Sequence, residues 1–216
     1  KKISDSDLVV AISSRALFNL EEEHRLFEEG DRGVRDHQIK NKDVPLEPGV
    51  AFPFVKRLLA LNSLFPEQTP FRVVALSRNS PETACRFFHS CRHYDLPIHA
   101  GAFTSGQSTF PYLRAFKISL FLSANPESVK LAVRAVPGGL VLPAHVPEED
   151  DDPTLRIAFD FDGVIADDES ERRYQSEGLS GFTGWRMKKP NAPRAGAVAR
   201  IFEKLSNFQR LDYETA

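Results

Sequence analysis

The chain has 216 residues, 41% of them hydrophobic, and its 28 Lys and Arg residues nearly balance its 30 Asp and Glu residues. That length and apolar content are enough for a sizeable buried core, in one domain or in a domain plus part of another. The formal net charge of -2 excludes the polybasic surface that would favour nucleic acid or anionic lipid as a partner.

The first predicted strand, residues 9–12, ends in polar side chains. Val9 to Ile12 is a continuous apolar run of strand length, and Ser13 and Arg15 follow it. A hydroxyl and a guanidinium at this place are able to bind a phosphate or a carboxylate through charge-assisted hydrogen bonds. A structural ion pair is an equally weighted alternative for Arg15.

The residues after this strand predict helices on either side of a loop. Residues 21–41 are strongly charged and predict a helix with Leu26 and Phe27 as its buried points. A proline-containing loop at residues 43–49 follows, and residues 52–65 have the pattern of an amphipathic helix.

The second predicted strand, residues 71–76, also ends in polar residues. Ser77 and Asn79 follow it directly, and a helix is predicted from residue 81 to residue 93. Hydroxyl, amide and helix N-terminal N–H groups at such a place suit an anion. The alternative is that this polar segment, through Ser80, only caps the helix.

Shorter elements complete the first part of the chain. Lys117 immediately precedes an apolar strand, which ends in the polar residues Ser123 and Asn125. The predicted elements are a strand at 97–103, a polar turn at 104–108, a helix at 112–116, strands at 118–125 and 138–143, and an acidic linker at 148–153.

The motif with the clearest chemistry follows at residues 155–163. Leu155 to Phe159 predicts a strand, Asp160 and Asp162 stand at its end, and Gly163 permits a tight turn. At an extended strand end these two carboxylates point the same way, whereas Phe161 points the other way into apolar packing. Oxygen-only ligands favour Mg²⁺ over zinc. A solvated Asp-rich loop after an ordinary strand is the alternative.

The sequence also contains an internal repeat. Val10-Ala11-Ile12-Ser13 stands where Ile157-Ala158-Phe159-Asp160 stands, and Glu21 falls on Asp168. Gly49 falls on Gly196 at the same offset of 147 residues. One gap-free offset shared by separate segments argues against chance. We therefore predict two α/β copies, one at residues 1–147 with a degenerate motif and one at residues 154–216 with the Asp-x-Asp motif.

The two predicted copies differ in charge. Ser13 and Arg15 stand where the second copy has Asp160 and Asp162, and neither a hydroxyl nor a guanidinium replaces a carboxylate on Mg²⁺. We therefore expect the first copy to be non-catalytic. The counterpart of Arg72 would fall beyond Ala216, so we expect the second copy to be truncated in this chain.

Membrane and export signals are not seen in the sequence. No apolar run approaches the roughly 18 residues of a membrane span, and the Lys1-Lys2 start carries no signal-peptide core. Cys85 and Cys91 make neither a disulfide framework nor a zinc site. We therefore expect a cytoplasmic protein with no membrane and no nucleic-acid partner, either a monomer or a homo-oligomer.

Four stretches together resemble a known family. They are Val10-Ala11-Ile12-Ser13-Ser14-Arg15-Ala16-Leu17-Phe18, Leu120-Phe121-Leu122-Ser123-Ala124-Asn125, Ala158-Phe159-Asp160-Phe161-Asp162-Gly163-Val164 and Asp168-Glu169-Ser170-Glu171. The combination looks like the cytosolic 5′-nucleotidase I family of haloacid-dehalogenase-like phosphohydrolases, over nearly the whole chain. The resemblance implies hydrolysis of nucleoside 5′-monophosphates with Mg²⁺ as the cofactor, through an aspartyl-phosphate.

The resemblance also implies roles for individual residues. Asp160 would be the nucleophile, Asp162 the acid and base, and both would hold the metal. Ser77, with Asn79 beside it, stands where this class holds the phosphoryl group, and Lys117 resembles the lysine that shares the phosphate charge.

A cap over the substrate is a further implication of the resemblance. The segment from Asp168 to Pro193 stands where this class places a small cap, and its rings at Tyr174, Phe182 and Trp185 either stack on a base or pack in a core. A nucleotide-binding regulatory module without turnover and a phosphatase of sugar phosphates are the alternative functions.

These patterns predict an α/β fold of the Rossmann-like, haloacid-dehalogenase-like type, with a mainly parallel sheet flanked by helices. Strands at residues 9–12, 73–76, 120–122 and 157–159 are expected to be central. The polar residues that follow them should then gather at the carboxyl edge of the sheet.

Overall fold

The chain divides into two compact units, Lys1–Leu155 and Arg156–Ala216. The computed structural model describes residues 3–28, 34–144, 152–167, 169, 172, 174–178, 183 and 195–215. Each unit is described below by itself.

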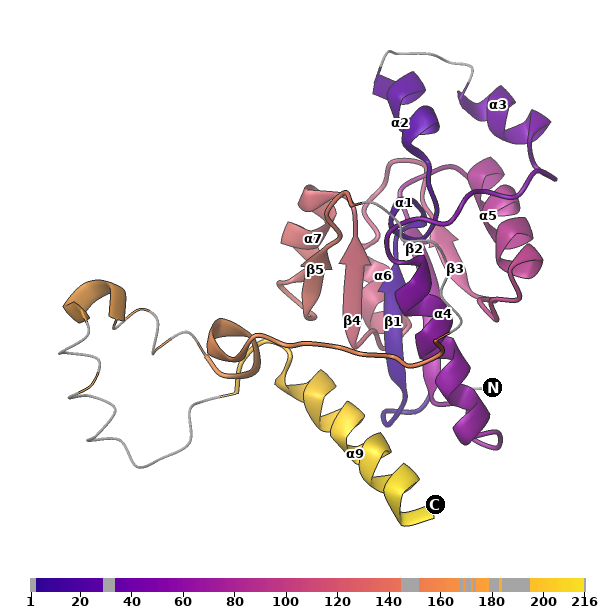
Figure 1. Ribbon diagram of the computed structural model, residues 1–216. Helices are drawn as coiled ribbons and strands as arrows, with labels where there is room; N and C mark the ends of the chain where they lie inside the picture. Colours follow the sequence, from indigo (N-terminus) through magenta and orange to yellow (C-terminus); the bar gives the residue numbers. More distant parts are fainter. Residues whose placement is uncertain are drawn as a thin grey trace. The chain divides into compact units, whose positions relative to one another are not determined.

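The first unit is built on a five-stranded parallel sheet in the order β3-β2-β1-β4-β5 (Figure 1). Val10 of β1 lies opposite Val73 of β2 on one side and Leu120 of β4 on the other. The predicted α/β fold with a parallel sheet is thus confirmed. The strands are β1 (Leu8–Ile12), β2 (Phe71–Ser77), β3 (Gly101–Phe103), β4 (Leu120–Ser123) and β5 (Gly138–Leu140).

Helices connect the strands of the first unit and flank the sheet. Proline at the first position starts α5 and α7, where its missing N–H costs no hydrogen bond. The first-unit helices are α1 (Ser14–Leu17), α2 (Glu21–Glu28), α3 (Val34–Lys40), α4 (Phe52–Ala60), the 3₁₀ helix η1 (Leu61–Leu64), α5 (Pro81–His93), α6 (Phe110–Ala115) and α7 (Pro126–Ala132).

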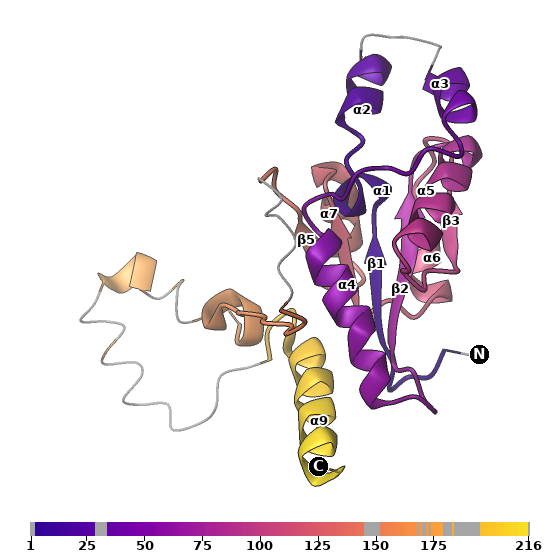
Figure 2. The same ribbon diagram turned by 45° about the vertical axis from the view of Figure 1, so that its right-hand side comes forward.

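Two apolar layers cover the two faces of this sheet. On one face the ring of Phe18 lies 6.1 Å from Phe52 of α4 and 5.3 Å from Phe87 of α5. On the other face Leu113 of α6 and Ala132 of α7 join a cluster with residues of β1, β2 and β4. The alternation of side chains along a strand explains why β1 is buried at every position. Figure 2 shows α4 running alongside β1 and β2.

The chain reverses its direction across the sheet between β1 and β4. From β1 it runs to β2 and β3 on one side, and it returns through α6 to β4 and β5 on the other. The carboxyl ends of β1 and β4 are the point at which parallel sheets of this type bind ligands. Ser13 stands at this point.

The first unit departs from the sequence prediction at element boundaries. The predicted strands at 97–103, 118–125 and 138–143 are each shorter, and the charged segment at 21–41 forms two helices rather than one. The side chains of Leu26 and Phe27 lie outside the described residues.

The second unit contains the helical turn η2 (Phe161–Ile165), of the π type, and the helix α9 (Ala199–Thr215). The predicted strand at residues 157–159 is wrong: residues 152–160 have no regular secondary structure. The described part of this unit contains no strand, so a strand at residues 157–159 would find no neighbouring strand there to pair with.

Among the described residues no helix combines the length and the apolar character needed to cross a membrane.

Candidate functional site

Polar residues meet at the carboxyl edge of the first sheet. The Ser14 and Ser77 hydroxyls lie 2.9 Å apart and are buried, and Asn79 Nδ2 donates to Ser14 Oγ at 3.2 Å. The backbone N–H of Asn79 donates to Ser77 Oγ at 3.1 Å. The predicted residues Ser77 and Asn79 are therefore brought together, and Ser14 connects them, a role the sequence did not suggest. Its position next to Ser13 at a strand end was the available signal.

Ser13 bridges β1 and β4 at the point where the chain reverses. Its backbone N–H donates to Leu122 O at 2.9 Å, and its Oγ accepts from Ala124 N at 3.3 Å. These bonds tie the exits of the two strands together. The hydroxyls at this edge thus already bond to protein groups.

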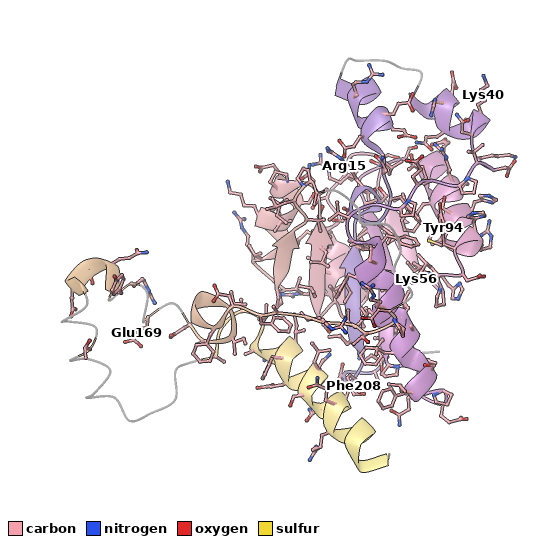
Figure 3. All side chains as sticks on the ribbon, viewed as in Figure 1. Arg15, Lys40, Lys56, Tyr94, Glu169 and Phe208 are labelled. Atoms are coloured by element: carbon pink, nitrogen blue, oxygen red, sulfur yellow. The ribbon has the colours of Figure 1, made fainter. Side chains whose placement is uncertain are left out.

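Arg15 points to a neighbouring carboxylate at this edge. Its Nε and one terminal nitrogen donate to the two carboxylate oxygens of Glu21, at 2.8 and 3.0 Å. Figure 3 shows Arg15 at the end of the sheet toward which the strands point. The bidentate ion pair agrees with the structural alternative for Arg15. The carboxylate of Glu21 neutralises the positive charge that would otherwise attract a phosphate.

Lys117 lies at the opposite edge of the sheet. It precedes β4, at the amino end of that strand, and its Nζ pairs with Asp5 Oδ1 at 2.7 Å. The strands are parallel, so the amino end of β4 is a full strand length away from Ser13 and Ser77. The geometry therefore gives Lys117 no part in a site at the carboxyl edge of this sheet, and its predicted role in sharing phosphate charge stays a prediction.

A cavity of about 160 Å³ opens at the carboxyl edge, between α6 and α7. Its lining includes the cation of Arg78, the carboxylate of Glu127 and the apolar residue Leu113. The hydroxyl-bearing residues Ser108, Thr109 and Ser128 also line it. Sequence reasoning assigned no role to Arg78. Its position just after β2 was the only signal.

The loop beside this cavity is held by backbone bonds to the exit of β2. Gly106 N donates to Arg78 O at 2.6 Å, and Thr104 N donates to Ser77 O at 3.1 Å. Ser105 adopts a φ of 47°, a left-handed conformation that a serine rarely takes. This polar turn is thus fixed in place against the strand ends.

Asp160 occupies the first position of the turn in the second unit. Its carboxylate is exposed, and its Oδ1 accepts from Phe161 N at 2.8 Å as an N-cap of η2. Phe161 is 48% exposed, so the prediction that it packs inward is wrong. Asp162 lies within η2, and its side chain is outside the described residues.

The donor set at Asp160 suits a hard cation. Carboxylate oxygens are the ligands that Mg²⁺ prefers, and the exposed carboxylate of Asp160 offers them to solvent. Within the described part of the chain, no three His, Cys, Asp or Glu side chains group to hold a metal ion.

Other predicted residues fall partly outside the described structure. Tyr174 is half exposed, whereas Phe182 and Trp185 lie outside the described residues. Burial raises the pKa of the Cys91 thiol to about 12, so this cysteine stays protonated near neutral pH and is neither a nucleophile nor a metal ligand there.

Comparison with known proteins adds sequence evidence to this geometry. The family model for 5′-nucleotidase matches residues 1–216. The chain is 32% identical over 214 residues to human cytosolic 5′-nucleotidase 1B, covering 95% of this chain and 35% of that protein. The chain thus spans about a third of the length of this curated relative. No solved structure matches.

Proposed function

Because this chain belongs to the 5′-nucleotidase family, we propose that the protein hydrolyses nucleoside 5′-monophosphates to nucleoside and phosphate. The observation that carries the proposal is the exposed carboxylate of Asp160, fixed by the hydrogen bond from Phe161 N at the start of a tight turn. One anchored oxygen orients the carboxylate for attack in a fixed direction. A cytoplasmic location belongs to the same proposal, since the relative is named a cytosolic enzyme.

Asp160 and Asp162 would divide the chemistry between them. An Asp160 oxygen attacks phosphorus in line, the bond from phosphorus to the 5′-oxygen breaks, and Asp162 gives that oxygen its proton. Asp162 then takes a proton from the water that attacks the aspartyl-phosphate, which releases phosphate and restores Asp160. Asp162 loses its proton in the first step and regains one in the second, so the cycle as a whole balances.

The same two carboxylates would hold Mg²⁺. When bound, the cation supplies charge that offsets the repulsion between a carboxylate and a phosphate dianion. Asp160 would supply the attacking oxygen, Asp162 would carry the proton, and both carboxylates would bind the cation. The phosphate-binding roles predicted for Ser77, Asn79, Ser13 and Arg15 stay predictions, and no step of this chemistry uses them.

Phosphate release tests this proposal. The full-length protein is given a panel of nucleoside 5′-monophosphates and sugar phosphates, with Mg²⁺ and with EDTA. We expect release from nucleotides only, and only with Mg²⁺. Asp160→Asn should lower kcat by more than about a thousandfold, roughly 4 kcal/mol in barrier, because the amide is no nucleophile.

Asp95→Asn is the matched control for this substitution. It removes one carboxylate from an exposed site in the first unit, at a φ of 52° that asparagine tolerates. We expect its kcat to equal that of the unaltered protein. An Asp160→Asn protein that folds and keeps a tenth of the activity would exclude covalent catalysis by Asp160.

The cavity beside Arg78 favours a second candidate, a nucleotide-binding module without turnover. The cavity lies in the first unit and is lined by the cation of Arg78, by hydroxyls and by one carboxylate, that of Glu127, but by no pair of carboxylates. A nucleotide bound there would be held without hydrolysis. Titration calorimetry with a nucleoside monophosphate distinguishes the two candidates. For a binding module we expect binding that Arg78→Ala abolishes and Asp160→Asn leaves unchanged. The unaltered protein should then release no phosphate.

A further inference from the structure

The geometry points to a repeated turn in the two units, in which a glycine of the second unit, Gly196, positions Asp160 for reaction. We infer that residues 160–167, 169 and 195–199 copy the arrangement of residues 13–19, 21 and 48–52, and that the first copy is structural only. The role of Gly196 rests on the proposed function of Asp160, whereas the repeated turn does not.

The two copies begin with the same backbone conformation. Ser13 has a φ of -75° and a ψ of 149°, and Asp160 has a φ of -67° and a ψ of 148°. Each residue precedes a single helical turn, α1 in the first unit and η2 in the second. Asp160 thus stands at the position of Ser13.

The turn of the second copy is one residue longer. In the first unit Phe18 N donates to Ser14 O at 2.9 Å, which closes an α turn. In the second unit Ala166 N donates to Phe161 O at 2.8 Å, which closes a π turn. A single inserted residue turns an α turn into a π turn, and such turns occur often at functional sites.

In both copies the residue after the turn accepts a hydrogen bond with its side-chain Oδ1 from the backbone N–H two residues later. Asn19 Oδ1 accepts from Glu21 N at 3.2 Å, and Asp167 Oδ1 accepts from Glu169 N at 3.3 Å. The structure therefore pairs Glu21 with Glu169, one residue away from the gap-free sequence alignment that pairs it with Asp168. The inserted residue in the turn accounts for this shift.

In each unit the backbone N–H of a glycine that lies later in the sequence donates a hydrogen bond to a carbonyl oxygen of the turn. In the first unit Gly49 N donates to Leu17 O at 2.8 Å, and Ala51 N donates to Ala16 O at 3.0 Å. An isolated antiparallel bridge joins Phe18 to the residue before Gly49. The helix α4 starts three residues after the glycine.

The second unit repeats these contacts. Gly196 N donates to Ile165 O at 2.7 Å, and Val198 N donates to Val164 O at 3.1 Å. An isolated antiparallel bridge joins Ala166 to Ala195, and α9 starts three residues after Gly196. These two hydrogen bonds, the bridge and the helix start thus recur in the same order.

Close backbone approach is the reason for glycine at both positions. A methyl group on Gly49 would lie 2.9 Å from Phe18 C and 3.0 Å from Ala16 O. On Gly196 it would collide with the carbonyl oxygens of Val164 and Ala166. Backbone atoms cannot rotate away as a side chain does, so any side chain here displaces the turn.

Displacement of η2 reaches Asp160, because Asp160 is the N-cap of that turn and its carboxylate is anchored on Phe161 N. A misplacement of about 1 Å in a reacting group is able to cost on the order of a hundredfold in rate. Gly196 is therefore a positioning residue. Gly49 holds a turn that begins at Ser13 and carries no nucleophile.

The pair Gly196→Ala and Gly49→Ala tests this difference in the full-length protein, because each places the same methyl group in the same kind of contact. We expect Gly196→Ala to lower kcat for phosphate release by about a hundredfold with KM within about threefold. We expect Gly49→Ala to leave both constants within about threefold, although it lowers Tm. An equal loss of kcat in both variants would overturn the inference, since general destabilisation would then explain it.

Amide hydrogen exchange in the unaltered protein supplies a readout that needs no activity. The amides of Ala166, Gly196 and Val198 should be protected, as should those of Phe18, Gly49 and Ala51. Fast exchange at the first three would overturn the repeated turn, even if Gly196→Ala fails to fold. Protected amides in a protein that releases no phosphate would refute the proposed function and leave the repeat standing.

Discussion

The Ser14 and Ser77 hydroxyls at the carboxyl edge of the first sheet bond to each other at 2.9 Å. Both residues are buried, so each hydroxyl needs a partner, and here the protein supplies it. A phosphate bound at this place would have to replace these internal bonds. This is the physical reason to assign the chemistry to Asp160, whose carboxylate is exposed.

Two arginine ion pairs of the first unit should differ in their contribution to the free energy of unfolding. Arg86 donates to Glu23 at 2.8 Å and to Val44 O at 2.9 Å, and both charged side chains are about a tenth exposed. Removing Arg86 takes the 2.8 Å partner from the buried carboxylate of Glu23 and leaves His37 Nε2 at 3.6 Å. Arg86→Ala should therefore lower the free energy of unfolding by about 3–5 kcal/mol. Urea denaturation measures this.

The comparison variant for that measurement is Arg15→Ala. The Arg15–Glu21 pair is bidentate, but its glutamate side chain is 66% exposed, so water screens the interaction. We expect a loss of less than about 1 kcal/mol. Equal losses for the two substitutions would contradict the argument from burial.

At the scale of elements, pattern and hydrogen-bond supply explain what the sequence predicted. The residues of β1 are all apolar and those of β2 are apolar except Arg72 and Ser77, and each strand has a neighbour, so the predicted strands at 9–12 and 71–76 form. Residues 155–159 have a similar apolar pattern and form no strand. Periodicity reports which side chains can be buried, but not whether a neighbouring strand is present to pair with.

The helix α5 contains both cysteines, and their different burial predicts that their thiols differ in reactivity. Cys85 is exposed, whereas Cys91 is buried and has its pKa raised to about 12 from an ordinary value of 9.0. Iodoacetamide at pH 8 should therefore modify Cys85 in the folded protein and Cys91 only after unfolding, which mass spectrometry of peptides resolves.

The same burial fixes the sign of a pH effect. The folded protein holds the Cys91 proton more tightly than the unfolded chain does, so this contribution to stability is complete below pH 9 and is lost as the pH rises toward 12. Modification of Cys91 at the same rate as Cys85 in the folded protein would contradict the packing of α5.

For the molecule as a whole, the sequence predicted more of the fold than of the site. The parallel sheet follows from alternating apolar and amphipathic segments, and it is confirmed. Lys117 shows why the site is harder: its type suits a phosphate, but only the strand direction places it at the amino end of β4, beside Asp5. Gly196 gave no chemical signal, because its role depends on backbone atoms that are distant in sequence.

The difference between the two units predicts the number of metal sites in the molecule. Mn²⁺, as a substitute for Mg²⁺, needs carboxylate oxygens, which Asp160 and Asp162 supply and Ser13 and Arg15 do not. Titration calorimetry of the full-length protein should therefore give one Mn²⁺ ion per chain. Asp160→Asn should weaken this binding at least tenfold, about 1.4 kcal/mol. Arg15→Ala should leave it unchanged, since its guanidinium pairs with Glu21. A second ion per chain that Asp160→Asn does not affect would place a metal in the first unit and would refute the division of roles between the two turns.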